Sequence, residues 1–211
     1  MNQTSAVRAI EKNGMLLVFP INNKKDPPSL WSVHFPRTKM RWEWDEDGDN
    51  RVSDLWHLRE KLSRSRKVIY TKWYQGRATF FSLECFSALL TLQEKNQTPL
   101  SREARQIYEL LLEESPQSTK QLKRASGLVG RRLEGIYQRA LKELWSRSLI
   151  VAYGEVDEGA FPSIAVGATK VLFEELYERA READPDQARA TLEARISSPA
   201  FLKQLKKQLS I

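Results

Sequence analysis

Apolar and polar positions follow helical spacing most clearly in the second half of the chain. Apolar residues recur at intervals of three and four between residues 104 and 112, and again between residues 133 and 145. Ser101 precedes the first segment as a suitable N-cap, and Ser118 or Thr119 is suited to cap a shorter segment between the two. The pattern therefore predicts three consecutive helices.

The third of these helices is expected to begin near Gly130, after a turn at Gly127. Its apolar residues define one buried face, so the intervening polar residues lie toward solvent or a partner. Residues 149–153 and 163–166 then predict two short strands joined by an acidic turn. Three helices followed by a two-stranded ribbon is the order of a winged helix-turn-helix, whose third helix enters the DNA major groove.

The first half has a β-hairpin as its clearest feature. Two β-branched and aromatic runs flank Gln75-Gly76, which is a suitable turn. Residues 29–35 fit either a helix or a strand. The other expected elements are helices from Thr4 or Ser5 to Lys12, from Ser53, over 84–93, from Val171, from near Asp184 and from Ser198, and a buried strand within 15–21.

These elements predict an α+β fold of the winged helix-turn-helix type with a helical C-terminal extension. Residues 94–99 have the composition of a linker. The expected domains are an N-terminal domain with the hairpin over residues 1–98, which could be a degenerate winged helix, a winged helix-turn-helix over 99–167, and the extension over 168–211.

Positive charge is concentrated in the predicted winged-helix domain. The chain has a net charge of +7 and a pI near 9.5. Eight basic and two acidic residues lie between residues 116 and 150. This favours binding to the phosphates of duplex DNA, with a solvated helical face as the alternative. The expected DNA-binding residues are Lys120, Lys123, Arg124, Arg131, Arg132, Gln138, Arg139 and Lys142.

Composition argues against several other classes of protein. No apolar run is long enough to span a membrane and no signal peptide is visible, so we expect a cytoplasmic protein without membrane contact. Cys85 is expected to be buried and inert, and with two histidines no zinc-ligand spacing arises. We expect no metal and no cofactor. The absence of a long heptad repeat favours a monomer.

Some residues are weaker candidates for contact with a DNA base or for a catalytic role next to it. Trp42 and Trp44 could stack on a flipped base, although core packing is the ordinary role of tryptophan. Glu84 and Asp54 are the carboxylates expected nearest a cleft. The acidic run at residues 45–50 lacks the glycine and glutamate positions of a calcium loop and is expected to be a surface loop.

Several motifs together resemble a known family. "LLVFPI", "KVIYTKWYQGRATFFSLE" and "LSREARQIYELLLEESPQSTKQLKRASG" are similar in order and spacing to small bacterial proteins related to the AlkZ-type winged-helix DNA glycosylases. The resemblance implies tandem winged-helix units around a DNA channel and a link to DNA repair. AlkZ-type enzymes remove alkylated bases and use a Gln-x-Gln motif to position water.

The chain departs from that family at the catalytic motif. It contains no Gln-x-Gln, and Phe19 and Ile21 stand where the glutamines would be needed. We therefore expect a DNA-binding protein without the standard glycosylase chemistry. Three alternatives stay open, namely a glycosylase that uses a nonstandard residue, a transcription regulator, and a protein-binding winged-helix module.

Overall fold

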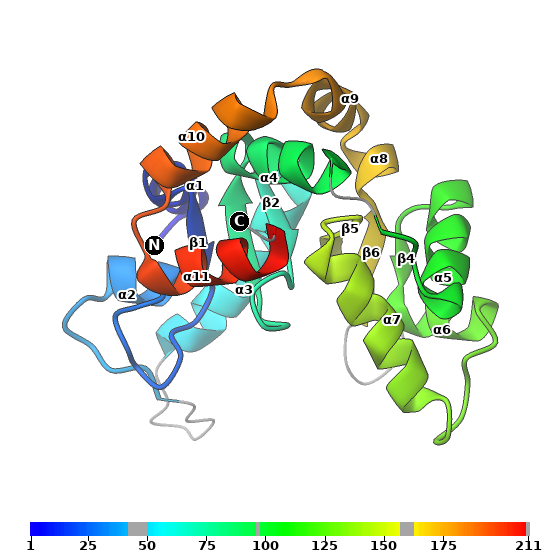
Figure 1. The fold of residues 1–211 in the computed structure, drawn as a ribbon. Coiled ribbons are helices and arrows are strands. Elements are labelled where there is room, and N and C mark those ends of the chain that lie inside the picture. Colours follow the sequence, from blue (N-terminus) through cyan, green and yellow to red (C-terminus); the bar gives the residue numbers. More distant parts are fainter. Residues whose placement is uncertain (42–49, 96–97, 157–162, 210–211) are drawn as a thin grey trace.

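A computed structural model describes residues 1–41, 50–95, 98–156 and 163–209. The described strands form one antiparallel sheet of six, with helices on both faces (Figure 1). Its spatial order is β1-β3-β2-β5-β6-β4. The strands are β1 (Met15–Leu17), β2 (Val68–Thr71), β3 (Thr79–Ser82), β4 (Gln117–Ser118), β5 (Ile150–Val156) and β6 (Ser163–Ala168). The mixed helical and strand content confirms the expected class at this level.

The helices fall into three groups along the chain. The first half contains α1 (Gln3–Asn13), α2 (Leu30–His34), α3 (Asn50–Arg64) and α4 (Leu83–Lys95). The second half contains α5 (Arg102–Glu113), α6 (Thr119–Ala125) and α7 (Glu134–Ser146). The C-terminal group is α8 (Thr169–Leu172), α9 (Glu174–Glu182), α10 (Pro185–Arg195) and α11 (Pro199–Leu209).

One order of elements occurs twice. The chain from α1 to β3 follows the order helix, strand, helix, helix, strand, strand, and the chain from α5 to β6 repeats this order. In each half the third strand lies between the first and the second. The two three-stranded sheets join through their second strands, where Tyr70 of β2 lies opposite Ala152 of β5. The junction of the two halves is thus the centre of the sheet.

Local sequence signals account for many of the observed boundaries. Ser101 and Ser118 cap α5 and α6 by accepting hydrogen bonds from backbone N–H groups of the first turns, as predicted. The predicted hairpin is confirmed as β2 and β3, and both Gln75 and Gly76 have positive φ angles of 51° and 72°. Residues 30–34, which fitted a helix or a strand, form α2 with Ser29 as N-cap.

Other boundaries differ from the sequence expectation. α7 begins at Glu134 and not near Gly130, because the chain from Gly127 to Leu133 forms turns, with φ of +66° at Gly127 and +97° at Gly130. The helix expected after β6 divides into α8 and α9 at Phe173, whose φ of −134° and ψ of 50° are not helical. β4 was not predicted, because two residues are too few to show a strand pattern.

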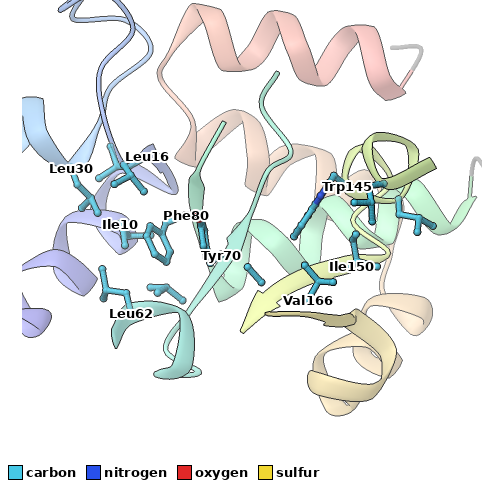
Figure 2. Packing of buried hydrophobic residues seen from close by; sticks show 14 of the residues in the cluster. Ile10, Leu16, Leu30, Leu62, Tyr70, Phe80, Trp145, Ile150 and Val166 are labelled. Carbon is cyan, nitrogen blue, oxygen red and sulfur yellow. The ribbon is translucent and has the colours of Figure 1, made fainter. Parts of the chain in front are cut away.

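Strand pleating divides the apolar core between the two faces of the sheet. Adjacent strand residues such as Ile69 and Tyr70 point to opposite faces of the sheet, and they belong to different clusters. Figure 2 shows part of the first cluster, which includes residues from α1, α3 and α7 as well as the strands. Its labelled members are Ile10, Leu16, Leu30, Leu62, Tyr70, Phe80, Trp145, Ile150 and Val166.

The C-terminal helices cover the second face. α9 and α10 pack along α4, as their arch above it in Figure 1 shows. α11 buries Phe201, Leu205 and Leu209, so its apolar side packs in the core as expected. The ring centroids of Phe201 and Tyr74 are 5.1 Å apart, which ties α11 to the β2–β3 turn. Cys85 is fully buried in the same cluster, which confirms that prediction.

A buried ion pair links the two halves at the centre of the sheet. Arg59 of α3 is 5% exposed and pairs with Glu155 of β5. Its guanidinium also donates a hydrogen bond of 3.0 Å to Tyr70 Oη and lies 3.9 Å from the centroid of the Trp56 ring. Because α3 belongs to the first half and β5 to the second, these contacts fix the orientation of one half against the other.

Gly154 allows the close approach of α3 to β5 beside this ion pair. Its φ is +80°, and the β5–β6 register shifts between Ala152 and Glu155. The Gly154 N–H donates to Ser63 Oγ at 2.9 Å. A Cβ at this position would lie 2.4 Å from the guanidinium carbon of Arg64. The positive φ is the feature that favours glycine here, because the Arg64 guanidinium is the flexible, half-exposed end of its side chain.

Replacing Glu155 with alanine should destabilise the whole chain. The change leaves the Arg59 guanidinium buried without its counter-charge, which costs about 3 kcal/mol or more. The free energy of unfolding from urea titration is the measurement. Glu178→Ala is the matched control because it breaks an exposed ion pair with Arg181, which should cost less than about 1 kcal/mol. Equal losses for the two variants would show that the junction does not depend on the ion pair.

Candidate nucleic-acid interface

A groove of about 530 Å³ lies between the turn of the β2–β3 hairpin and the helices α6 and α7. We call it the basic groove. The hairpin contributes Lys72, Gln75 and Gly76 to its lining. The opposite side includes Thr119, Lys120, Lys123, Tyr137, Gln138 and Lys142. Both halves of the chain therefore contribute to one concave surface.

Tyr137 holds the α6–α7 side of the groove together. Its side chain is almost fully buried, and its hydroxyl donates a hydrogen bond of 2.6 Å to the carbonyl oxygen of Thr119. Burial, and next the neighbouring Glu134 carboxylate, raises the pKa of Tyr137 well above its ordinary value. The hydroxyl thus stays protonated and keeps α7 against the start of α6.

Positive charge dominates the lining of the basic groove. Four lysines line it, at positions 72, 120, 123 and 142, and Glu134 is the one carboxylate among the lining residues that the structure describes. Such a surface attracts a polyanion.

Glu134 neutralises one of these lysines. It accepts hydrogen bonds from Lys123 Nζ and, at 2.9 Å, from Gln138 Nε2. These bonds, first that from Lys123 and then that from Gln138, lower the pKa of the Glu134 carboxyl. The carboxylate therefore stays ionised in the groove at neutral pH and sets the position of Lys123.

Comparison with known protein families identifies the family of the chain. A family model described as AlkZ related matches residues 1–210. The chain belongs to the AlkZ-related family. No curated protein and no solved structure matches it. Family membership confirms the relationship to AlkZ-type proteins that the sequence motifs indicated.

Half of the expected DNA-binding residues of this AlkZ-related chain line the basic groove. Lys120, Lys123, Gln138 and Lys142 lie in it together. The other four are exposed but are not part of its lining, namely Arg124, Arg131, Arg132 and Arg139.

Arg131 and Arg132 occupy a different kind of segment from the one predicted. They were expected on the exposed side of a helix, but they lie in the turn that precedes α7. The preceding positive φ angle at Gly130 and the late start of the helix are the reason. Their side chains are nevertheless exposed, so they remain accessible to a partner next to α7.

The two weaker carboxylate candidates, Glu84 and Asp54, do not line the basic groove. Trp42 and Trp44 lie outside the described residues. Glu84 pairs at 2.9 Å with Arg195 of α10, on the face covered by the C-terminal helices. Asp54 is exposed on α3 and does not line the groove. The expectation that Glu84 borders the cleft was therefore wrong for this groove, because α4 and α10 hold it on the opposite face of the sheet.

Sequence reasoning missed the hairpin contribution, above all Lys72. The one local signal is that Lys72 interrupts an otherwise apolar and aromatic run between Val68 and Tyr74. Its position opposite α7 depends on the pairing of β2 with β5, which brings together residues far apart in the chain. No periodicity within the hairpin could reveal that pairing.

No group of histidine, cysteine, aspartate and glutamate among the described residues could hold a metal ion. No helix in this part of the chain has the length and apolarity needed to cross a membrane. A second cavity of about 530 Å³ lies beside α4 and α5. Its Glu94 accepts a hydrogen bond of 2.5 Å from the Tyr177 hydroxyl, and this bond joins α4 to α9.

We place the candidate interface at the basic groove because four lysines line it.

The titration of Glu134 should report the geometry of the groove. Because Lys123 and Gln138 bond the ionised form, its titration midpoint should lie below the ordinary value of 4.5. Lys123→Met should raise the midpoint toward 4.5, and Gln138→Ala should raise it less. Carbon NMR of the side-chain carboxyl measures each value. An unchanged midpoint in Lys123→Met would contradict the assigned contact.

Proposed function

We propose that this AlkZ-related chain binds duplex DNA through the basic groove, in a role linked to DNA repair, without the Gln-x-Gln chemistry of AlkZ-type glycosylases. The observation that carries the proposal is the concentration of lysines from both halves of the chain in one groove. Lysine and arginine side chains that neutralise phosphates release condensed counterions, which gives affinity for any DNA sequence. The family relationship supports DNA as the polyanion.

The arrangement of elements supports a winged helix-turn-helix over residues 99–167. α5, α6 and α7 form the helical part, and β4, β5 and β6 form its three-stranded sheet. In such a fold the third helix enters the major groove. α7 presents Gln138, Arg139 and Lys142 as exposed side chains, which are suited to phosphate or base-edge contacts.

The first half supports a tandem arrangement. Residues 1–98 contain the same order of elements, followed by α4, and the two sheets pair through β2 and β5. We propose residues 1–98 and 99–167 as two winged-helix domains and residues 168–211 as the extension that packs on α4. Both domains then meet the same DNA, because each lines the basic groove.

The contacts to phosphate are assigned to side chains rather than to the N-terminus of α7. The first turn of that helix contains Glu134, whose carboxylate would repel a phosphate approaching the free N–H groups. Lys120, Lys142, Arg131 and Arg132 provide positive charge on either side of it.

The catalytic motif of the AlkZ-type enzymes has no counterpart at the expected place. Phe19 and Ile21 follow β1, and both pack against the apolar core. Apolar side chains neither activate nor orient a water molecule. This supports DNA binding with the standard glycosylase reaction lost.

Binding of fluorescent duplex DNA should be strong at low salt and should weaken steeply as salt rises. Replacing Lys120 and Lys142 together with alanine should weaken binding at low salt, because both are exposed lysines that line the basic groove. Each lost phosphate contact should also reduce the slope of log K against log salt by about 0.9. Fluorescence anisotropy over a salt series measures both quantities.

The matched control removes the same charge elsewhere. Lys206 and Lys207 are exposed on α11, which packs in the second cluster and does not line the basic groove, so their double alanine variant should bind DNA nearly as the unmodified chain does. Equal losses in the two double variants would show that net charge alone drives binding. Absence of binding at low salt would overturn the proposed function and would favour a protein-binding module.

A further inference from the structure

Lys72 differs from the other lysines of the basic groove. It follows the last residue of β2, and its side chain is half-buried where it lines the groove. Lys120 and Lys142 are exposed, and Lys123 is paired with Glu134. Lys72 takes part in no ion pair within residues 1–41, 50–95, 98–156 and 163–209.

The surroundings of Lys72 favour the neutral amine. Burial, and next the positive charge of Arg59, lowers the pKa of Lys72 below its ordinary value of 10.5. Arg59 is itself fixed by Glu155, Tyr70 and Trp56, so its charge cannot move away. The charged groups that share the groove lining are three further lysines and Glu134, and the carboxylate is bonded to Lys123. A lysine that is desolvated beside another cation is an activated nucleophile.

The chemistry of DNA limits what such an amine could attack. Intact duplex carries no group that reacts readily with an amine. A deoxyribose that has lost its base opens to an aldehyde at C1′, and amines condense with aldehydes without a metal or cofactor. The basic groove would hold the flanking phosphates of such a site.

We propose that Lys72 Nζ forms a Schiff base with the C1′ aldehyde of an abasic deoxyribose in DNA bound along the basic groove. The lone pair of Nζ forms the C–N bond, and the aldehyde oxygen leaves as water after taking up protons, which gives an iminium ion. This inference rests on the proposed DNA-binding function. It adds a nucleophile and a substrate class, abasic DNA.

The iminium allows strand cleavage without an oxidant or reductant. Loss of a C2′ proton to water provides electrons that form the C2′–C3′ double bond. The C3′–O bond breaks and the 3′ phosphate leaves with the bonding pair. Water then hydrolyses the iminium, which returns the Lys72 amine.

Reductive trapping tests the Schiff base on the full chain. The probe is a fluorescent duplex with one abasic site, incubated with protein and sodium cyanoborohydride, which converts the iminium into a stable crosslink. Denaturing gels measure the crosslink, and anisotropy in parallel samples measures DNA binding. Lys72→Arg removes the nucleophilic amine and places a cation in the groove, so it should lower the crosslink yield by at least about tenfold without weakening DNA binding.

Lys67→Arg is the matched control. Lys67 is an exposed lysine just before β2 that does not line the basic groove, so the same kind of substitution there should leave the crosslink yield equal to that of the unmodified chain. Mass spectrometry of the trapped unmodified chain locates the adduct independently of any variant. The modified lysine blocks trypsin, so the adduct should appear on peptide 68–77.

The outcomes separate this inference from the proposed function. An adduct on Lys72 that Lys72→Arg loses supports the Schiff base. DNA binding with no crosslink, or with the adduct on another lysine or on the N-terminal amine, overturns the role of Lys72 but leaves DNA binding intact. Absence of DNA binding overturns both.

Discussion

The pairing of β2 with β5, fixed by the Arg59–Glu155 ion pair, is the contact on which the rest of the structure depends. A buried guanidinium is stable only with a counter-charge and hydrogen-bond acceptors, and the two halves each provide part of these. Their mutual orientation is therefore set by charge as well as by apolar packing. Gly154 permits the close approach of α3 that this ion pair requires.

The basic groove is a direct consequence of that junction. β2 continues into the turn that carries Lys72 and Gln75, and β5 follows directly after α7. When the two strands pair, the hairpin turn and α7 must lie on either side of one concavity. Positive charges far apart in sequence then meet. Arg59 stabilises the junction and, after burial, is the second cause that lowers the pKa of Lys72. Arg59 thus contributes both to the stability of the junction and to the proposed reaction at Lys72.

The sequence predicted the elements whose determinants are local. The periodic apolar faces of α5 and α7, the caps Ser101 and Ser118, and the Gln75-Gly76 turn all follow from neighbouring residues. The start of α7 was placed too early because helical spacing alone does not reveal the turns before Glu134. The hairpin side of the groove was missed for a different reason, since the position of Lys72 opposite α7 depends on long-range strand pairing. Charge clustering found the α6–α7 side because those lysines are close in sequence.

Hydrogen exchange with and without duplex DNA tests the central claim most directly, because it locates the interface without changing any residue. Binding in the basic groove predicts slower amide exchange in the hairpin turn at residues 72–77 and in residues 119–142, with no change in α9, α10 and α11. Protection confined to the C-terminal helices, or bound DNA with no protection on either side of the groove, would contradict the account.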